Sequence, residues 1–467
     1  MSIIIPANSA TGGGGFDAAN SVRFDDASSD YFRWNSAPSG NREKFTWSAW
    51  FKRSSVGATQ ILASASYSGG DEGYLFLSGG GVLGWQSTNS GDGNLTTAKL
   101  FRDTNAWYHV VFSVDTTQST ATNRIKLYVN GSQYTWDGNT TQPNQNQSLY
   151  WNVGDTYYPY IGRRNGGDYF DGYMAEIVQV NNAQLAADSF GEFDEDSGIW
   201  KPIDVSGLTF GDTGYYLNFQ DSSALGNDVS GENHDWTSYN LAAIDQTTDT
   251  CTNNFATLNP LIPFGGTFSE GNLQHTRSSS GYRSAVSSIG AKTGKWYVEI
   301  KSPDDENMGV GVINGDNAAG LYMSGSEQFL GQHSYDAGYY FNGILYVGNS
   351  SQSGSWTSYT SNDIIGIALD ADNGYVYFSK NGSFVNSGNP ASGSSGTGGY
   401  ALSGIGSSGT YFIGCSTGNN SEHYVNFGNP IFSISSGNAD GNGFGNFEYA
   451  VPSGYFALCT KNLAENG

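Results

Sequence analysis

The stretch Ile125-Lys126-Leu127-Tyr128-Val129-Asn130-Gly131 decides the fold class, because its side chains alternate in character and the run then meets Asn-Gly. Alternation is typical of a half-buried strand, and Asn-Gly tolerates the positive φ angles of a tight hairpin turn. A second run, Tyr375-Val376-Tyr377-Phe378-Ser379-Lys380, meets Asn381-Gly382 in the same way. The two stretches predict β-hairpins in two distant parts of the chain.

Short runs of aromatic and β-branched residues, separated by turn residues, surround both hairpins. The clearest are residues 45–51, 107–115, 170–177, 295–301, 308–313, 363–370, 411–415 and 423–428. Many short strands favour antiparallel sandwiches over βαβ units. A chain of 467 residues is also too long for one hydrophobic core. We therefore predict an all-β protein with two tandem antiparallel β-sandwich domains of the jelly-roll type.

The chain divides into four predicted segments. Residues 1–20 form an extended N-terminal arm, in which the apolar tip Ile3, Ile4, Ile5 and Pro6 precedes four consecutive glycines. Residues 21–195 form the first sandwich, and residues 271–467 form the second. Residues 196–270 contain several prolines and only sparse strands, so we expect a connector that packs partly on the first sandwich. We interpret the arm as an assembly element that anchors the protein.

The charge of the chain restricts its partners. The formal net charge is −23, with only 20 Lys and Arg residues, which argues against nucleic acid and anionic membrane as partners. No stretch approaches the ~20 apolar residues that span a membrane, so no membrane insertion is expected. The N-terminus lacks the basic region of a secretory signal, which predicts synthesis in the cytoplasm.

Cys251, Cys415 and Cys459 are widely spaced, so we expect free buried thiols.

The strand motifs resemble those of two known families. Residues 21–195 resemble the laminin-G/pentraxin branch of the concanavalin A-like superfamily, through the stretches 45–51, 107–110, 127–131 and 170–177. Residues 272–460 resemble SPRY domains, through Gly294-Lys295-Trp296-Tyr297-Val298-Glu299 and the stretches 363–370, 374–382 and 425–428. The resemblance implies a concanavalin A-like sandwich followed by a SPRY-like sandwich.

The pair of domains behind the arm Met1-Ser2-Ile3-Ile4-Ile5-Pro6-Ala7-Asn8-Ser9 resembles proteins of marine tailed phages. This resemblance implies a virion surface protein, either a tail-fibre or appendage component or a capsid decoration. Its expected partners are other virion proteins through the arm and a host cell-surface glycan or protein. We expect a homo-oligomer, with a trimer as the specific guess. The alternatives are a purely structural virion component without receptor binding and a cellular carbohydrate-binding or adhesion module.

An enzymatic role is not predicted. Glucanases of the concanavalin A-like fold carry Glu-x-Asp-x-x-Glu on one strand, which supplies the two carboxylates of glycoside hydrolysis. The nearest approach here is Glu192-Phe193-Asp194, but Ser197 occupies the third place. We expect this stretch to lie in an acidic loop. His109 lies within a predicted strand, which favours a structural role.

Calcium is the one cofactor that the resemblance suggests, because laminin-G-like domains often bind it and Ca²⁺ needs clustered oxygen ligands. The loop-borne candidates are Asp25, Asp26, Asp155, Asp168 and Asp171. The sequence contains no Asp-x-Asp-x-Asp-Gly series, and solvated loop acids are the alternative interpretation. No other cofactor is expected.

A glycan site is predicted between residues 134 and 160, where aromatic residues lie among Asn and Gln. The candidate ligand-binding residues are Trp136, Trp151, Tyr157, Tyr158 and Tyr160. Flat rings stack on sugar faces, and amides hydrogen-bond to sugar hydroxyls. The alternative is that several of these rings pack in the core of the sandwich.

Overall fold

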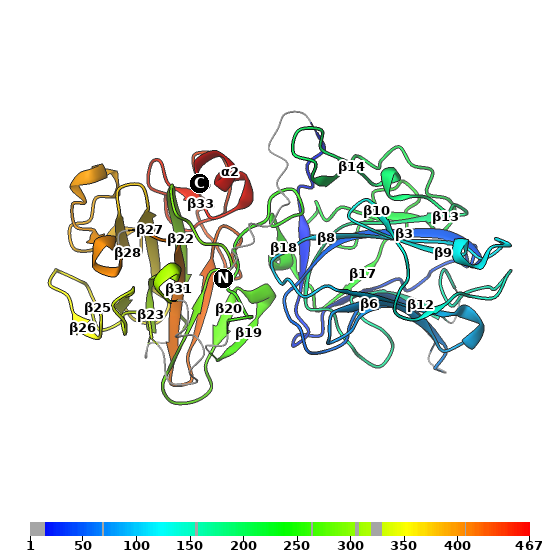
Figure 1. Cartoon of the computed structure of the whole chain (residues 1–467), viewed down its shortest axis with the longest axis horizontal. Helices are drawn as coiled ribbons and strands as arrows, with labels where there is room; N and C mark the ends of the chain where they lie inside the picture. Colours follow the sequence, from blue (N-terminus) through cyan, green and yellow to red (C-terminus); the bar gives the residue numbers. More distant parts are fainter. Residues whose placement is uncertain are drawn as a thin grey trace. The chain divides into compact units, whose positions relative to one another are not determined.

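The computed structural model describes residues 15–67, 70–154, 157–262, 265–303, 308–318, 329–406 and 408–467. The chain divides into two compact units, and the boundary in the sequence lies between Thr252 and Asn253 (Figure 1). The predicted all-β class with tandem antiparallel sandwiches is confirmed. The α-helices of the described part are the short α1 (Gly315–Ala318) and α2 (Thr460–Asn466), and neither is long and apolar enough to span a membrane.

The first unit is a sandwich of two large antiparallel sheets. The first sheet runs in the order β10 (Ser132–Tyr134), β9 (Ile125–Val129), β8 (Tyr108–Asp115), β3 (Lys44–Arg53), β13 (Gly172–Asn181), β1 (Ser21–Phe24), β18 (Gln246–Thr247), with β16 (Tyr215–Leu217) also paired to β13. The β9–β10 hairpin turns on Asn130 and Gly131, whose φ angles are 46° and 80°. The Asn-Gly hairpin prediction is therefore confirmed in this unit.

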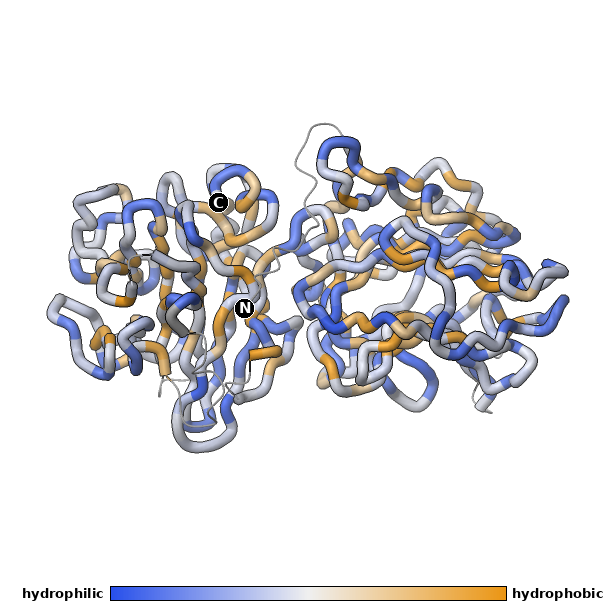
Figure 2. Tube along the Cα trace, viewed as in Figure 1, coloured by the Kyte–Doolittle hydropathy of each residue, from blue (hydrophilic) through white to orange (hydrophobic). Residues whose placement is uncertain are grey.

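The second sheet of this unit carries the candidate site described below. Its order is β11 (Thr140–Thr141), β7 (Asn94–Leu100), β6 (Val82–Ser87), β5 (Glu72–Leu77), β4 (Gln60–Tyr67), β12 (Tyr157–Ile161), β2 (Tyr31–Arg33), β17 (Thr237–Tyr239). The core between the sheets contains Trp47 and Phe112 from the first sheet and Leu75 and Trp85 from the second. Figure 2 shows the apolar residues concentrated along the strands.

Residues 196–252, expected to belong to a connector, are part of the first unit. They supply β15 (Trp200–Pro202), β16, β17 and β18. β15 pairs with β14 (Gly191–Phe193) in a small separate hairpin. Phe210 and Tyr216 of this segment pack with Trp50, Trp107 and Tyr173 in a second apolar cluster. These strands have two or three residues each, which is too short for an alternating pattern to be recognised in the sequence.

The segment is held by a fully buried ion pair between Lys52 of β3 and Asp249. The indole Nε1 of Trp107 donates to Asp249 Oδ1 at 3.2 Å, and the Lys52 ammonium lies 4.5 Å from the centre of the Tyr173 ring. Burial lowers the pKa of Lys52, and the Asp249 carboxylate opposes that shift. Arg23 of β1 pairs with Asp245 at 2.9 Å. Two ion pairs thus fix residues 245–249 against the first sheet.

The second unit is also a sandwich of two sheets. The larger sheet runs β19 (Thr267–Ser269), β20 (Gln274–Thr276), β32 (Glu422–Asn426), β22 (Lys295–Lys301), β27 (Ile364–Asp370), β28 (Tyr375–Lys380), β29 (Ser383–Phe384), with β30 (Tyr400–Ala401) beside β28 and β33 (Phe456–Ala457) parallel to β22. The smaller sheet runs β21 (Tyr282–Val286), β31 (Tyr411–Gly418), β23 (Met308–Asn314), β24 (Asp336–Tyr340), β25 (Ile344–Val347), β26 (Ser350–Ser351). The β28–β29 hairpin turns on Asn381 and Gly382, as predicted. The unit begins at Asn253, so residues 253–270 of the expected connector belong to it.

Removing one partner of the buried pair should weaken the first unit strongly. Replacing Asp249 by Asn leaves the Lys52 ammonium buried without its counter-charge, which costs about 3–5 kcal/mol. We expect Asp249→Asn to lower the melting temperature of the first unit and to leave that of the second unit unchanged in differential scanning calorimetry. Glu192→Gln is the control, because Glu192 pairs with Lys201 but is 55% exposed, and such pairs contribute at most about 1 kcal/mol. Equal effects of the two substitutions would contradict this account.

Candidate functional site

The outer face of the second sheet in the first unit gathers aromatic and basic side chains. Phe32 and Ile161 are completely buried in the core, so their neighbours along β2 and β12 face outward. Tyr160 lies directly opposite Arg33, and Arg33 lies opposite Thr237 of β17. Direct cross-strand partners share one face of a sheet, so these side chains form one row across three strands.

Tyrosine rings pack against one another along this face. Tyr31 and Tyr239 are direct cross-strand partners, and their rings stack in parallel with centroids 4.6 Å apart. The Tyr31 ring also lies 6.0 Å from the Tyr160 ring and 6.2 Å from the Tyr169 ring. Tyr160 is only 6% exposed, whereas Tyr31, Tyr158, Tyr169 and Tyr239 are partly exposed. The four partly exposed rings are held in place by these contacts and still reach solvent.

Two guanidinium groups lie over these rings. The Arg33 guanidinium lies 5.0 Å from the Tyr158 ring centre and 4.7 Å from that of Tyr239. The Arg163 guanidinium lies 4.6 Å from the ring of Tyr31 and 5.1 Å from those of Tyr160 and Tyr169. Each such contact contributes about 0.5–1 kcal/mol at a partly exposed position.

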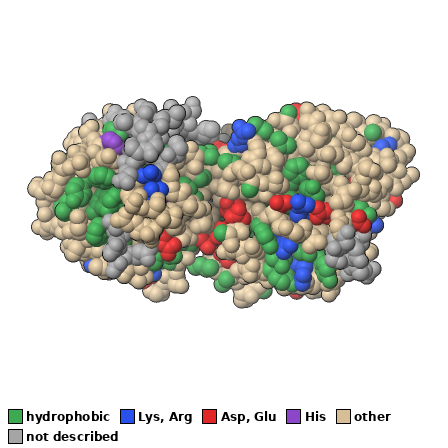
Figure 3. Space-filling view, turned by 90° about the horizontal axis from the view of Figure 1, so that it is seen from below, with side chains coloured by type: hydrophobic (Ala, Val, Ile, Leu, Met, Phe, Trp, Pro, Cys, Tyr) green, Lys and Arg blue, Asp and Glu red, His purple; other side chains and the backbone are tan. Residues whose placement is uncertain are grey.

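We call this group the tyrosine–arginine face; it consists of Tyr31, Arg33, Tyr158, Tyr160, Arg163, Tyr169 and Tyr239. Figure 3 views the first unit from the side of its second sheet. Lys and Arg side chains (blue) lie there beside a cluster of side chains coloured as hydrophobic (green), a group that includes Tyr. Polar groups border the face: Asn35 Nδ2 donates to Thr237 Oγ1 at 2.7 Å, and Arg33 donates to the hydroxyl of Tyr239.

Of the five predicted ligand-binding residues, Tyr158 and Tyr160 belong to this face. Trp136 and Trp151 do not, because both are buried in the core. The Trp136 Nε1 donates to the Ile125 carbonyl at 3.2 Å, and the Trp151 ring stacks on Phe45 at 5.8 Å. For these two residues the alternative of core packing is correct. Tyr157 belongs to β12, but its side chain lies outside the described part of the structure, as do the arm residues Ile3, Ile4, Ile5 and Pro6.

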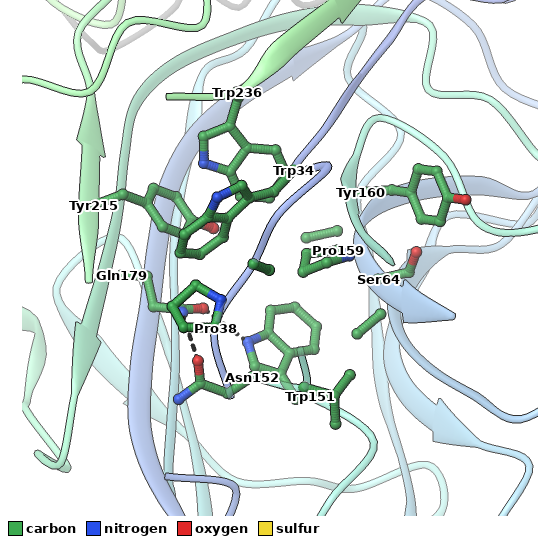
Figure 4. Close-up of a pocket in the computed structure, with 14 residues that line it drawn as sticks. Trp34, Pro38, Ser64, Trp151, Asn152, Pro159, Tyr160, Gln179, Tyr215 and Trp236 are labelled. Atoms are coloured by element: carbon green, nitrogen blue, oxygen red, sulfur yellow. Dashed lines mark hydrogen bonds between the residues drawn. The ribbon is translucent and has the colours of Figure 1, made fainter. Parts of the chain in front are cut away.

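A cavity between the sheets borders Trp151 and Tyr160 but is too small for a sugar. Its volume is about 20 Å³, and its lining includes Trp34, Gln179, Tyr215 and Trp236 (Figure 4). Such a volume holds roughly one water molecule, whereas pockets for drug-sized ligands start near ~300 Å³. A saccharide bound to this sandwich would therefore lie on its surface.

Three of the five predicted calcium ligands come together at one edge of the first unit. Asp25, Asp26 and Asp171 each offer a carboxylate oxygen, and these oxygens lie within 4.8 Å of one another. Phe24 of β1 is the cross-strand partner of Gly172 of β13, which places Asp25 beside Asp171. Of the other two candidates, Asp168 pairs with Arg164 at 2.6 Å, and Asp155 lies outside the described residues.

The chemistry of this acidic cluster fits a hard cation. Burial raises the pKa of Asp171 to about 7, and the charges of Asp25 and Asp26 add to the shift. Burial also raises the pKa of Asp25. Carboxylate oxygens are preferred ligands of Ca²⁺, which takes about six to eight oxygens. The three carboxylates would supply part of that set, and water or a ligand's hydroxyl groups would supply the remainder.

The stretch Glu192-Phe193-Asp194 differs from its expected loop conformation. Glu192 and Phe193 form β14, which pairs with β15 as a short hairpin stabilised by the packing of Phe193 on Trp200. Hydrogen bonds from Ser197 and Lys201 lower the pKa of Asp194 to about 2. Asp194 therefore acts as a hydrogen-bond acceptor within its own turn.

Comparison with known families gives two matches. The model described as the concanavalin A-like lectin/glucanases superfamily matches residues 26–188, and the SPRY domain model matches residues 294–430. The chain combines a concanavalin A-like domain with a SPRY domain. No curated protein matches the chain significantly. The concanavalin A-like match contains every residue of the tyrosine–arginine face except Tyr239, which lies in β17 beyond its end.

Three solved structures illustrate the similarity. The SPRY domain of human HERC1 is 17% identical and covers 33% of this chain and 87% of its own, with a TM-score of 0.24. The native heptameric SAP-like pentraxin from Limulus polyphemus is 14% identical, with 37% and 80% covered and a TM-score of 0.28. The TRIM65 PSpry domain is 12% identical, with 37% and 89% covered and a TM-score of 0.27.

Titration of the acidic cluster should be visible in the stability of the concanavalin A-like domain. The folded-state pKa of Asp171 is raised from 3.8 to about 7, so its stabilising effect is complete below pH ~4 and is lost as the pH rises through ~7. Asp171→Asn should remove this loss, which is roughly 4 kcal/mol at most. We expect the variant to be more stable than the original protein above pH 7 in calcium-free buffer, as measured by calorimetry.

Calcium should reverse that difference. A cation that binds the folded domain raises its melting temperature by mass action, so CaCl₂ should stabilise the original protein and not Asp171→Asn. Asp168→Asn is the matched control and should keep the calcium response, because Asp168 pairs with Arg164 outside the cluster. An unchanged melting temperature of the original protein in calcium would contradict the proposed site.

Proposed function

We propose that this protein is a non-enzymatic surface protein that binds glycans through the tyrosine–arginine face of its concanavalin A-like domain. Lectin-like concanavalin A-like and SPRY domains fit a carbohydrate-binding or adhesion module. The observation that carries the proposal is the alignment of partly exposed tyrosines on the neighbouring strands β12, β2 and β17.

The face has the properties that sugar binding requires. Neighbouring strands lie ~4.8 Å apart, so the rings on β12, β2 and β17 form a continuous aromatic surface for successive sugar units. Aromatic faces contact the apolar C–H faces of sugars, while hydroxyl and amide groups such as those of Thr237 and Asn35 hydrogen-bond to sugar hydroxyls. Stacking with Arg33 and Arg163 orders the rings before binding, which reduces the entropic cost of association.

The biological setting that we propose is the virion of a tailed phage. The N-terminal sequence with Ile3, Ile4, Ile5 and Pro6 would anchor the protein to other virion proteins, as a tail-fibre or appendage component or as a capsid decoration. The resemblance of the arm and the domain pair supports this setting. The described structure also leaves Cys251, Cys415 and Cys459 as buried free thiols, which agrees with synthesis in a host cytoplasm.

Assembly into a homotrimer would multiply weak contacts with a host-surface glycan into avid binding. A purely structural virion component is the second candidate. It differs from the first in one measurable respect, because it predicts no saturable binding of glycans or cells.

Ring truncation tests the proposed glycan site. Tyr158→Ala and Tyr239→Ala each remove a ring of the face, and we expect about tenfold weaker binding to the glycans that score highest on a glycan array. This corresponds to the ~1.4 kcal/mol typical of one aromatic contact. Tyr128→Ala is the control, because Tyr128 lies on β9 in the other sheet. Equal binding by all three variants, with folding verified by circular dichroism, would refute the assignment of the face.

The proposed setting has its own test. Mass spectrometry of particles purified from cells that produce this protein should detect it at a fixed ratio to the major capsid protein. A protein that stays in the soluble fraction while intact particles form would refute the virion role and leave glycan binding to be judged by the array.

A further inference from the structure

The tyrosine–arginine face contains two cations without carboxylate partners. Among the described residues, neither Arg33 nor Arg163 forms an ion pair, whereas Arg164 beside them pairs with both Glu72 and Asp168. The formal net charge of the chain is −23. Other arginines of the described part, such as Arg102, also lack a carboxylate partner, but Arg33 and Arg163 combine this lack with a position over several tyrosine rings.

The hydrogen bonds of Arg163 leave donors free for a ligand, whereas Arg33 already donates to Asn35 and to the Tyr239 hydroxyl. Arg163 donates from Nε to the Arg164 carbonyl at 2.9 Å, and its two terminal nitrogens have no acceptor within the part of the chain that the structure describes. Tyrosine rings cover the flat side of a guanidinium but leave its in-plane N–H groups accessible. A planar guanidinium with free N–H groups matches carboxylate and sulfate oxygens in a bidentate manner.

The stacking also reduces the cost of using these arginines. A free arginine side chain loses about 2 kcal/mol of rotamer entropy when a ligand fixes it. Here Arg163 already lies over three rings and Arg33 over two. The donors are therefore arranged before the ligand arrives.

We propose that the tyrosine–arginine face recognises an acidic saccharide, with Arg33 and Arg163 binding its anionic groups while the tyrosines contact its rings. The anionic group is a uronate carboxylate or a sulfate ester, which present the same oxygen geometry to a guanidinium. This inference rests on the proposed glycan-binding function and adds the class of ligand.

The overall negative charge is compatible with an anionic ligand. Charges are screened beyond ~8 Å at physiological ionic strength, so the local field at the face depends mainly on its own arginines. The acidic cluster Asp25, Asp26 and Asp171 lies on loops next to the face in sequence, since Asp171 follows Tyr169 closely and Asp26 precedes Tyr31. Its charge would restrict the anionic groups of a ligand to the side of Arg33 and Arg163.

Isothermal titration calorimetry of the full chain with matched oligosaccharides tests this inference. One pair is oligogalacturonate and its methyl ester, and the other is a sulfated galactan oligosaccharide and its desulfated form. We expect at least one acidic member to bind ten times or more tightly than its neutral counterpart. Raising the NaCl concentration should weaken the acidic ligand's binding and leave neutral binding unchanged.

The variants separate the arginines from the tyrosines. Arg33→Gln and Arg163→Gln should each weaken binding of the acidic ligand tenfold or more and weaken binding of its neutral counterpart by a much smaller factor, which reflects the lost ordering of the rings. Arg163→Lys should restore only part of the loss. Arg102→Gln is the matched control, because Arg102 is an exposed arginine of the same unit without a carboxylate partner among the described residues. It should bind like the original protein.

The outcomes distinguish the inference from the function on which it rests. Equal binding of acidic and neutral saccharides, or unchanged acidic binding in both Gln variants, would overturn the acidic-saccharide inference and leave the glycan-binding proposal intact. Absence of binding to every saccharide would overturn the glycan-binding proposal itself. Equally tight binding of a single-stranded oligonucleotide would show a general preference for polyanions and would also overturn the inference.

Discussion

The buried ion pair between Lys52 and Asp249 is the interaction on which the rest of the first unit depends. A buried charge is tolerated only when a partner compensates it, so the pair fixes where residues 245–249 lie, and Arg23 strengthens that attachment through Asp245. β17 ends six residues before Asp245 and pairs with β2. The pairing that stacks Tyr239 on Tyr31 is therefore stabilised by charges on the opposite sheet.

The sequence predicts the parts of the structure that contain long alternating runs, and it does not predict the shortest strands. Both Asn-Gly hairpins and both sandwiches are predictable, because long alternating runs specify which face is buried. Trp136 and Trp151 are not, since an aromatic ring in a loop between strands can face either the core or the solvent, and only the packing on residues such as Phe45 decides it. Tyr239 lies in a three-residue strand, too short to indicate either its partner or its face.

The local charge at the candidate site differs in sign from the net charge of the chain. The net charge of −23 correctly describes an acidic protein, but it says nothing of two arginines that lie on tyrosines and away from carboxylates. The sequence indicated five candidate calcium ligands but not which of them lie together. The register of β1 on β13 brings Asp25 close to Asp171. Strand register, which brings distant residues together, determines both sites.

The most direct test of the account is a crystal structure of the whole chain with the acidic oligosaccharide that it binds most tightly. The account predicts a saccharide across β12, β2 and β17, with a carboxylate or sulfate group held by Arg33 or Arg163 and a sugar ring against Tyr158 or Tyr239. A saccharide bound to the SPRY domain, or to the concanavalin A-like domain away from this face, would contradict it.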